Sequence, residues 1–338
     1  MKRLILGNEA VAMGALRAGM TFFAAYPITP ASEIMHYLAA KEDEIAFIHA
    51  EDEIASIHLA IGGSLAGRKA LTSTAGPGMS LKQEGIGLAH MMEVPLVIVN
   101  VQRVGPSTGM PTLPSQGDII QSIHGSHGDY TSIVLYPSSV EECFRYSIEA
   151  FNAAEEARCP VILLLDGFLS HLAETVDLEA IPVKTVPRTL APLGTGKRHF
   201  TGLLSRNGIP CTKDTKYYRE WYAATKKKVL DAAQGYRFYD YHRNEKSDTL
   251  IVAYGISYRV VLPLKREYSI FKPVTLFPIL ADEIKAAAAE HKRIVVVEMN
   301  DGQYAGELER LLHRDVISVP MLGGLISLKE VKERLHEL

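Results

Sequence analysis

The sequence predicts an α/β protein built from two doubly wound, mostly parallel sheets. Helical and strand-like segments alternate through the first half of the chain, as they do when crossover helices join parallel strands. Residues 95–102 and 160–166 are continuous apolar runs, which are typical of strands covered on both faces. The alternation resumes from residue 250 onward and predicts a second, smaller domain of the same class.

Apolar periodicity divides the first half of the chain into helices and strands. The predicted helices cover residues 10–18, 31–40, 52–66, 81–90 and 138–156. The predicted strands cover residues 22–26, 45–49, 69–74, 95–102, 131–135 and 160–166. Thr29 is a natural N-cap, and Pro30 suits the first position of the helix that follows. The segment Ser138-Ser-Val-Glu141-Glu142 offers the last of these helices a capping box in either of two registers.

Residues 176–247 interrupt this alternation. They are rich in proline and glycine and contain a charged helical segment at 213–233, which predicts a linker with an ordered insertion. Beyond it, strands are expected at 250–254, 274–277, 293–299 and 316–319, and helices at 257–267, 282–291 and 304–313. Ser327-Leu-Lys-Glu330 is a capping box that opens a terminal helix. We therefore expect a first domain at 1–185, a linker or insertion at 186–246 and a second domain at 247–338.

Composition narrows the class of protein. The 338 residues are 47% hydrophobic and 22% charged, which is ordinary for a globular protein in solution. The net charge of −3 argues against a large nucleic-acid surface, and no apolar run has the length of a membrane span. The N-terminal apolar stretch is too short for a signal peptide. The isolated cysteines at 143, 159 and 211 predict no metal cluster and no disulfide framework, so we expect a cytoplasmic protein.

Glu53 is the most informative residue of the first domain. It opens the predicted helix at 52–66, which is apolar almost all round, and the strand and glycine-rich segment ending at Gly78 follow. Carboxylates at a helix start also suit the helix dipole, so Glu51, Asp52 and Glu53 have a purely structural interpretation. A carboxylate in an apolar crevice is costly, however, unless it has a function. Thiamine diphosphate is a cofactor whose activation needs such a lone carboxylate at N1′ of its aminopyrimidine ring.

Several short segments occur in an order that is typical of one family. They are Gly7-Asn-Glu-Ala10, Tyr26-Pro-Ile-Thr-Pro30, Thr74-Ala-Gly-Pro-Gly78, Gln102-Arg-Val-Gly-Pro-Ser-Thr-Gly109, His127-Gly-Asp-Tyr130 and Val297-Glu-Met-Asn300. With them the chain resembles the alpha subunit of the 2-oxoacid:ferredoxin oxidoreductases over nearly its whole length. The resemblance implies a thiamine-diphosphate pyrimidine-binding domain followed by a transketolase C-terminal-like domain. It also implies oxidative decarboxylation of a 2-oxoacid, with transfer of the acyl group to coenzyme A and of electrons to ferredoxin.

The resemblance implies a partner. In this family a beta subunit carries the magnesium and diphosphate site, with a Gly-Asp-Gly motif, and the iron–sulfur cluster. Here Gly117-Asp118 is followed by Ile119 and Gly128-Asp129 by Tyr130, so neither pair forms that motif. We therefore expect thiamine diphosphate to be shared with a beta subunit, no metal on this chain, and no nucleic acid or membrane as partner. Whether a separate gamma subunit takes part stays open.

The resemblance also assigns the residues of the site. Glu53 is expected to act as the catalytic carboxylate at N1′, with Glu51 as the alternative. Thr29 and Arg103 are expected to bind the 2-oxoacid, because a guanidinium can clamp a carboxylate with two hydrogen bonds. Val104 departs from the glycine that usually follows this arginine.

Backbone close to the aminopyrimidine ring is expected from Ala75, Gly76 and Gly78, where small residues allow a close approach. His124, His127 and Asp129 are expected in a loop at a subunit junction. His49 and His58 are expected to be buried and hydrogen-bonded rather than catalytic.

The expected substrate is 2-oxoglutarate, followed by a branched-chain 2-oxoacid such as 2-oxoisovalerate. Two alternatives come from other classes. One is a transketolase-like half that acts on a sugar phosphate, although the loop after Arg103 offers few basic residues for a phosphate. The other is a non-catalytic scaffold subunit of a split thiamine enzyme, although the Glu53 carboxylate is present. Copurification with an iron–sulfur partner would separate these readings.

Overall fold

A large sheet carries the first domain in the structure, a computed structural model that describes residues 2–195 and 201–338. Its strand order is β15-β7-β8-β5-β4-β2-β3, with β6 paired to β5 beside this path. Neighbouring strands from β7 to β3 are parallel, and β15 is antiparallel at the edge. The strands are β2 (Phe22–Ala25), β3 (Ala46–His49), β4 (Ala70–Thr74), β5 (Leu96–Val104), β6 (Met110–Pro114), β7 (Ile133–Leu135), β8 (Pro160–Asp166) and β15 (Thr275–Phe277).

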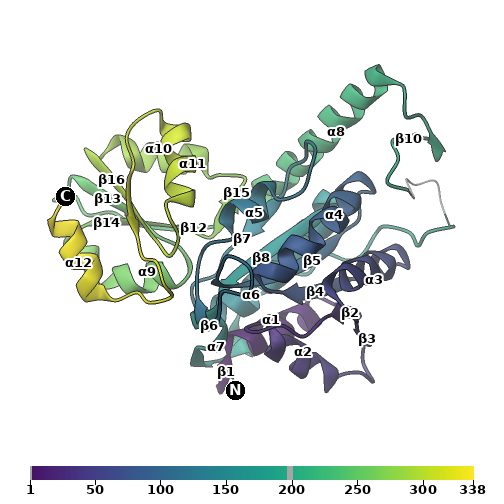
Figure 1. Cartoon of the computed structure of the whole chain (residues 1–338), viewed down its shortest axis with the longest axis horizontal. Helices are drawn as coiled ribbons and strands as arrows, with labels where there is room; N and C mark the ends of the chain where they lie inside the picture. Colours follow the sequence, from purple (N-terminus) through teal and green to yellow (C-terminus); the bar gives the residue numbers. More distant parts are fainter. Residues whose placement is uncertain (1, 196–200) are drawn as a thin grey trace.

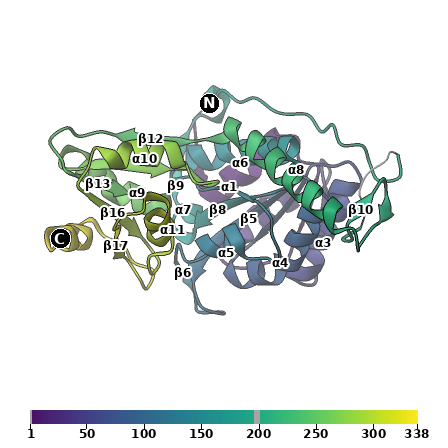
Figure 2. The same cartoon turned by 90° about the horizontal axis from the view of Figure 1, so that it is seen from above.

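Helices cover both faces of this sheet, as the sequence predicts (Figures 1 and 2). One face packs against α1 (Gly7–Arg17), α2 (Ser32–Ala39) and α6 (Val140–Ala157). The other packs against α3 (Glu53–Leu65), α4 (Gly76–Met91) and α5 (Ile119–His124). Strand β5 shows why its apolar run is continuous. Val97, Val99 and Val101 enter the first core, whereas Leu96 and Ile98 enter the second, because successive side chains of a strand point to opposite faces.

The second domain has a smaller sheet with the order β12-β14-β13-β16-β17. Its strands are β12 (Tyr239–His242), β13 (Thr249–Val252), β14 (Ser269–Pro273), β16 (Arg293–Glu298) and β17 (Ile317–Pro320), all parallel to their neighbours except β12. Its helices are α9 (Gly255–Val261), α10 (Ala281–Ala289), α11 (Gln303–Leu312) and α12 (Leu328–His336). The core beneath α10 and α11 is continuous with the core beneath α3 and α4, so one apolar cluster joins the two domains.

Two strands change the predicted path of the chain. We expected residues 274–277 to be a strand of the second domain. They do form β15, but it pairs with β7 of the large sheet, with Thr275 opposite Leu135. That expectation was wrong because β14, just before it, already fills the place between β12 and β13. Strand β12 in turn lies in the predicted linker yet pairs with β14. The boundaries at residues 185 and 246 stay predictions, and residues 196–200 of the linker lie outside the described residues.

The N-terminus contains a strand that the sequence reading missed. Strand β1 (Arg3–Leu6) pairs antiparallel with β9 (Ala173–Val176), and α1 begins at Gly7 rather than at residue 10. The carboxylate of Glu9 accepts a hydrogen bond of 3.0 Å from the backbone nitrogen of Leu6, so the acidic residue closes the start of the helix. A short helix, α7 (Gly167–His171), follows β8.

The charged helix predicted in the linker is confirmed as α8 (Thr215–Ala233). Asp214 is its N-cap and accepts a hydrogen bond of 2.9 Å from the backbone nitrogen of Tyr217. Figure 1 shows α8 as a long arm, with the small hairpin β10 (Ser205–Arg206) and β11 (Ile209–Pro210) beyond its start. Short 3₁₀ turns complete the fold at η1 (Leu178–Ala180), η2 (Gln234–Tyr236) and η3 (Leu262–Arg266). Within the described residues no helix is long and apolar enough to cross a bilayer.

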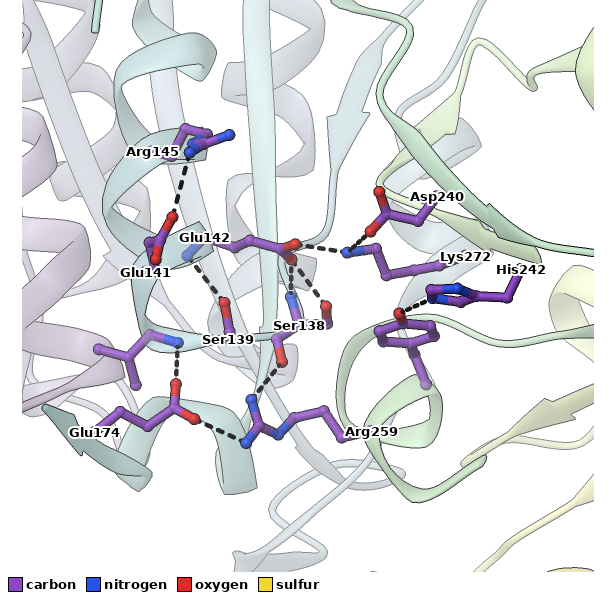
Figure 3. A network of polar contacts seen from close by, with 12 residues as sticks. Ser138, Ser139, Glu141, Glu142, Arg145, Glu174, Asp240, His242, Arg259 and Lys272 are labelled. Carbon is purple, nitrogen blue, oxygen red and sulfur yellow. Dashed lines mark hydrogen bonds and ion pairs between the residues drawn. The ribbon is translucent and has the colours of Figure 1, made fainter. Parts of the chain in front are cut away.

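A polar network ties the two domains together at the start of α6 (Figure 3). The structure selects the second capping register, in which Ser139 Oγ accepts a hydrogen bond from the backbone nitrogen of Glu142. Oε2 of Glu142 accepts hydrogen bonds of 2.8 Å from the backbone nitrogen and the hydroxyl of Ser138, and its Oε1 pairs with Lys272 of β14 at 2.5 Å. Asp240 of β12 pairs with the same ammonium group. Arg259 of α9 completes the network with an ion pair of 2.7 Å to Glu174 of β9.

Candidate active site

The residues predicted for the site meet at the carboxyl ends of β2, β4 and β5. The N-termini of α3 and α4 lie at the same edge, since each helix follows a strand of the parallel sheet. Open α/β sheets bind their ligands at this edge. Glu53 is contributed by α3, Gly76 and Gly78 by α4, Arg103 by β5, and Thr29 by the loop after β2.

Glu53 is the first residue of α3 and its side chain is buried. Asp52 is the N-cap, and its Oδ1 accepts a hydrogen bond of 2.6 Å from the backbone nitrogen of Ala55. Asp52 therefore fulfils the capping function, and Glu53 points into the protein with 7% of its surface exposed. Glu51 is exposed. This geometry favours Glu53 over Glu51 as the carboxylate of the site.

Gly78 lies directly against the Glu53 side chain. A Cβ atom at position 78 would be 2.5 Å from both Cγ and Oε1 of Glu53, and still closer to the Thr74 hydroxyl. No side chain larger than hydrogen fits there. At Gly76 a Cβ atom would be 3.1 Å from Oδ2 of Asp118. The first turn of α4 thus lies between two carboxylates, which its positive dipole end favours.

The segment at 74–78 is not the turn that we predicted. Helix α4 begins at Gly76, with Ala75 as a buried N-cap residue, rather than at residue 81. Pro77 occupies an early helical position, where its missing N–H group has no partner to lose. The close backbone approach expected from Ala75, Gly76 and Gly78 therefore comes from the start of a helix.

Arg103 is buried rather than solvated at the end of its strand, with 8% of its surface exposed. Its Nη1 donates a hydrogen bond of 2.7 Å to the main-chain carbonyl of Thr29, whereas its Nε is buried without a partner among the described residues. Burial lowers the pKa of Arg103, and the carboxylates of Asp118 and Glu53 oppose that shift. A buried guanidinium with unused donors is suited to bind an anion.

Thr29 reaches the site, but not as a helix cap. Helix α2 begins at Ser32 and its N-cap is Ala31, so the predicted capping role of Thr29 is wrong. The reason lies in the neighbours of the loop. Arg103 binds the carbonyl of Thr29, and Asn8 Nδ2 binds the carbonyl of Pro30 at 2.8 Å. These contacts hold the loop before the helix begins, and Thr29 remains exposed beside Arg103.

Asp118 is a site residue that the sequence reading missed. Its carboxylate accepts a hydrogen bond of 3.0 Å from Asn100 Nδ2, and its backbone nitrogen donates one of 3.0 Å to Gln102 Oε1. Burial raises the pKa of Asp118, while Asn100 and Arg103 oppose the rise. The signal was available in β5, because Asn100 and Gln102 are polar residues in an otherwise apolar strand that leads to Arg103.

The second domain holds the loop that carries Asp118. Asn300 Nδ2 donates a hydrogen bond of 2.8 Å to the carbonyl of Gln116, and Gln303 Nε2 donates one of 2.6 Å to the carbonyl of Gly117. The Val297-Glu-Met-Asn300 segment therefore helps to hold the loop that carries Asp118, through Asn300, without contributing Asp118 itself. Glu298 within it is buried and accepts hydrogen bonds from the Tyr254 hydroxyl and the start of α11.

Lys82 is the other residue that the sequence reading missed. It lies on α4 four residues after Gly78 and is fully buried beneath the start of α3. Its Nζ donates to Thr72 Oγ1 at 3.1 Å and to the carbonyl of Glu53 at 3.3 Å. Burial lowers the pKa of Lys82 to about 7, and Glu53 and Asp52 oppose the shift. The sequence offers no clear signal for Lys82, because polar residues follow it directly at Gln83 and Glu84.

The histidines lie outside this cluster. His49 and His58 are exposed, so the expectation that they are buried is wrong, because each projects from the solvent side of its element. His58 Nδ1 lies 2.7 Å from the carbonyl of Ile54 in the preceding turn. His124 ends α5, and His127 and Asp129 lie in the loop before β7. Within the described ranges no group of three or more histidine, cysteine, aspartate or glutamate residues could hold a metal ion.

Comparison with known proteins identifies the family of the chain. Residues 13–241 match the family described as "Pyruvate flavodoxin/ferredoxin oxidoreductase, thiamine diP-bdg". The chain is 41% identical to the 2-oxoglutarate synthase subunit KorA of Archaeoglobus fulgidus, covering 99% of this chain and 97% of that one. It is 34% identical to the ketoisovalerate oxidoreductase subunit VorB of Methanothermobacter thermautotrophicus, again over 99% and 97% of the two chains.

A solved structure extends the comparison to the fold. The 2-oxoglutarate:ferredoxin oxidoreductase of Magnetococcus marinus, with 2-oxoglutarate, coenzyme A and succinyl-CoA bound, superimposes with a TM-score of 0.92 at 31% identity. The match covers 99% of this chain and 65% of that one, so this chain spans just under two thirds of its length. The family model over residues 13–241 and the relatives that cover nearly the whole chain lead to one conclusion: this chain belongs to the 2-oxoacid:ferredoxin oxidoreductases, as an alpha subunit.

Proposed function

We propose that this chain is the thiamine-binding subunit of an enzyme that oxidatively decarboxylates 2-oxoglutarate to an acyl-CoA and reduces ferredoxin. The single observation that carries the proposal is the convergence of a buried carboxylate, Glu53, and a buried guanidinium with unused donors, Arg103, at one sheet edge. The relative named 2-oxoglutarate synthase is 41% identical to the chain, against 34% for the ketoisovalerate relative, which favours 2-oxoglutarate.

The residues present fit the aminopyrimidine half of thiamine diphosphate. Gly76 and Gly78 bring the backbone at the start of α4 close to the carboxylates of Asp118 and Glu53, and Asn100 Oδ1 is a buried acceptor without a partner among the described residues. Glu53 would hold a proton in a hydrogen bond with N1′, and the backbone from Ala75 to Gly78 would lie along the ring. When bound, the cofactor supplies the nucleophilic carbon and accepts the electron pair released on loss of CO₂.

Arg103 and Thr29 are proposed to bind the 2-oxoacid. The bond from Arg103 Nη1 to the Thr29 carbonyl fixes the guanidinium plane and leaves Nε available for the substrate carboxylate. Such a charge-assisted pair would orient the oxo carbon. Asp118 faces the same space and would repel a misplaced anion, so it would help to confine the carboxylate to Arg103.

A partner is proposed for the other half of the cofactor. Neither Gly-Asp pair of the chain forms a Gly-Asp-Gly motif. We therefore assign the magnesium and diphosphate site and the iron–sulfur cluster to a beta subunit, with a gamma subunit as a further possible component, in the cytoplasm. The chain alone should bind thiamine diphosphate weakly or not at all. Calorimetric titration with cofactor and magnesium tests this, and tight binding without a partner would contradict the shared site.

A branched-chain 2-oxoacid is the second candidate, because the ketoisovalerate relative covers the same share of the chain. The test is reconstitution of the complex and measurement of ferredoxin reduction with 2-oxoglutarate, 2-oxoisovalerate and pyruvate under matched conditions. We expect the largest kcat/KM for 2-oxoglutarate. A larger kcat/KM for 2-oxoisovalerate would make the branched-chain 2-oxoacid the proposed substrate and leave the proposed reaction unchanged. No coenzyme A-dependent reduction with any of them would overturn the proposed function and support the scaffold alternative.

A further inference from the structure

Lys82 is buried against the main chain of Glu53, the proposed catalytic residue. None of its surface is exposed, and its Nζ contacts three oxygens: the carbonyl of Glu53, Ser56 Oγ and Thr72 Oγ1. Ser56 Oγ also donates a hydrogen bond of 3.0 Å to the carbonyl of Glu53. The ammonium group therefore joins the first turn of α3 to β4 from its place on α4.

The spacing along α4 explains this position. Gly78 and Lys82 are four residues apart, so they lie on the same face of the helix, one turn from each other. Gly78 lies against the Glu53 side chain, and Lys82 reaches the main chain of the same residue. One face of α4 thus determines both where the Glu53 carboxylate lies and what charge lies below it.

The contacts of Lys82 leave its charge uncompensated at hydrogen-bond distance. All three acceptors are uncharged oxygens, and a buried ammonium group is costly without a nearby anion. The charged groups of α3 that act on it are Glu53 and Asp52, and Asp52 is engaged as the helix cap. From β5, Arg103 interacts electrostatically with Glu53 and with Asp118. Glu53 is therefore the available counter-charge.

We propose that Lys82 is a positioning residue for Glu53: its buried ammonium group fixes the first turn of α3 against β4 and holds a positive charge that acts on the Glu53 carboxylate. The proposal rests on the proposed function, since it assigns Glu53 to N1′ of thiamine diphosphate. It predicts that loss of the charge, and not merely of the hydrogen bonds, alters the reaction.

The test uses the assembled complex and two readouts. The first is the pH dependence of hydrogen–deuterium exchange at C2 of the bound cofactor, followed by NMR after acid quench. The second is the affinity for thiamine diphosphate at fixed magnesium, measured by calorimetry. Lys82→Met removes the charge and keeps the length of the side chain. It should move the acid limb of the exchange profile upward by about one pH unit, because the positive charge that acts on the Glu53 carboxylate is removed.

Lys69 provides a matched control. It is also a buried lysine and donates to two uncharged carbonyls, those of Ala18 and Val186, but it lies at the opposite end of β4. Lys69→Met should lower the melting temperature without moving the acid limb. If Lys82→Met also lowers the melting temperature without moving the acid limb, Lys82 only stabilises the fold and the proposal is overturned. If Lys82→Met does not assemble, Lys82→Gln, which keeps a donor and loses the charge, must show the shifted limb.

A double variant separates this proposal from the function on which it rests. In a Glu53→Gln background, Lys82→Met should change the exchange rate by less than about twofold, since no carboxylate remains for the charge to act on. An equal loss in both backgrounds would overturn the proposal for Lys82 alone. Wild-type exchange in Glu53→Gln itself would instead overturn the assignment of Glu53, whatever Lys82 does.

Discussion

Arg103 and Thr29 are joined by a hydrogen bond of 2.7 Å, from the guanidinium Nη1 to the main-chain carbonyl. The bond brings the end of β5 to the loop between β2 and α2. Thr29 therefore helps to orient Arg103 through its main-chain carbonyl, independently of its side chain. The bond also means that one edge of the guanidinium is already held by the protein before any ligand arrives. The Nε of the same guanidinium is buried without a partner among the described residues.

Arg103→Lys should weaken the use of every 2-oxoacid. Lysine keeps the charge but cannot bind both the Thr29 carbonyl and a carboxylate with fixed geometry. We expect kcat/KM to fall roughly 10- to 100-fold for all 2-oxoacids, the range for loss of a hydrogen bond to a charged group. Exchange at C2 of the cofactor needs no substrate and should stay almost unchanged. Unchanged kcat/KM for all substrates would contradict the assignment, and loss for 2-oxoglutarate alone would place Arg103 at its distal carboxylate.

Glu53→Gln should nearly abolish decarboxylation by the assembled complex. The amide cannot hold and share a proton with N1′ as the carboxylate does, and such roles are worth about 10²–10⁴-fold. Glu51→Gln is the matched control, because Glu51 is exposed two residues away and should keep close to full activity. Exchange at C2, measured by NMR, is the direct readout. The reverse result, with activity lost only in Glu51→Gln, would move the catalytic role to Glu51.

Gly78→Ala should displace Glu53. The added methyl group would come within 2.5 Å of the Glu53 side chain, and overpacking of this kind costs about 1–3 kcal/mol. Gly62→Ala on α3 is the control, because a Cβ atom there meets nothing within 4 Å. It should stabilise the chain by roughly 0.5–1 kcal/mol, since alanine is favoured over glycine in a helix. Denaturant unfolding gives both values. Wild-type thiamine diphosphate affinity and stability in Gly78→Ala would contradict the placement of Glu53.

Lys82 should give the chain a pH-dependent stability. Burial lowers its pKa to about 7 in the folded chain, whereas an unfolded lysine keeps its proton up to about pH 10.4. Between these values the unfolded chain binds more protons, so the free energy of unfolding should rise with pH across that window.

In Lys82→Met the free energy of unfolding should rise less with pH than in the wild type. The stability of the variant relative to the wild type should therefore be greatest below about pH 7 and should decrease toward pH 10. Lys329→Met removes an exposed lysine of α12 and should leave the slope as in the wild type. Denaturant unfolding of the purified chain at several pH values measures the slopes. Equal slopes in the wild type and Lys82→Met would show that Lys82 does not titrate in this window.

Much of the fold followed from local pattern. The apolar runs at β5 and β8 and the helices between them identified parallel strands covered on both faces, because a strand or helix must bury its apolar side wherever it lies. Capping residues also identified helix starts, as at Ser327, whose Oγ accepts from the backbone nitrogen of Glu330 at 3.2 Å. Such signals act over a few residues and need no knowledge of the rest of the chain.

The sheet to which β15 belongs could not be predicted in this way. A strand as short as Thr275–Phe277 carries little pairing information of its own. Strand β14 occupies the position between β12 and β13 in the small sheet, so β15 pairs with β7 at the edge of the large sheet. A hydrogen bond of 2.8 Å from the Tyr136 nitrogen to the Val274 carbonyl holds it there. The start of α2 depended likewise on Arg103 and Asn8, which hold the preceding carbonyls from distant parts of the sequence.

The sequence by itself determined the class of fold, because periodicity is a local property of the chain. It also identified Glu53 and Arg103 as candidates for the site, through the ordered segments that resemble one family. Only the tertiary structure decided that Glu53 lies between Gly78 and a buried Lys82, and that Asp118 faces the same helix start. These relationships depend on how α3, α4 and β5 pack against one another. Distances between elements are properties of packing, which no short stretch of sequence specifies.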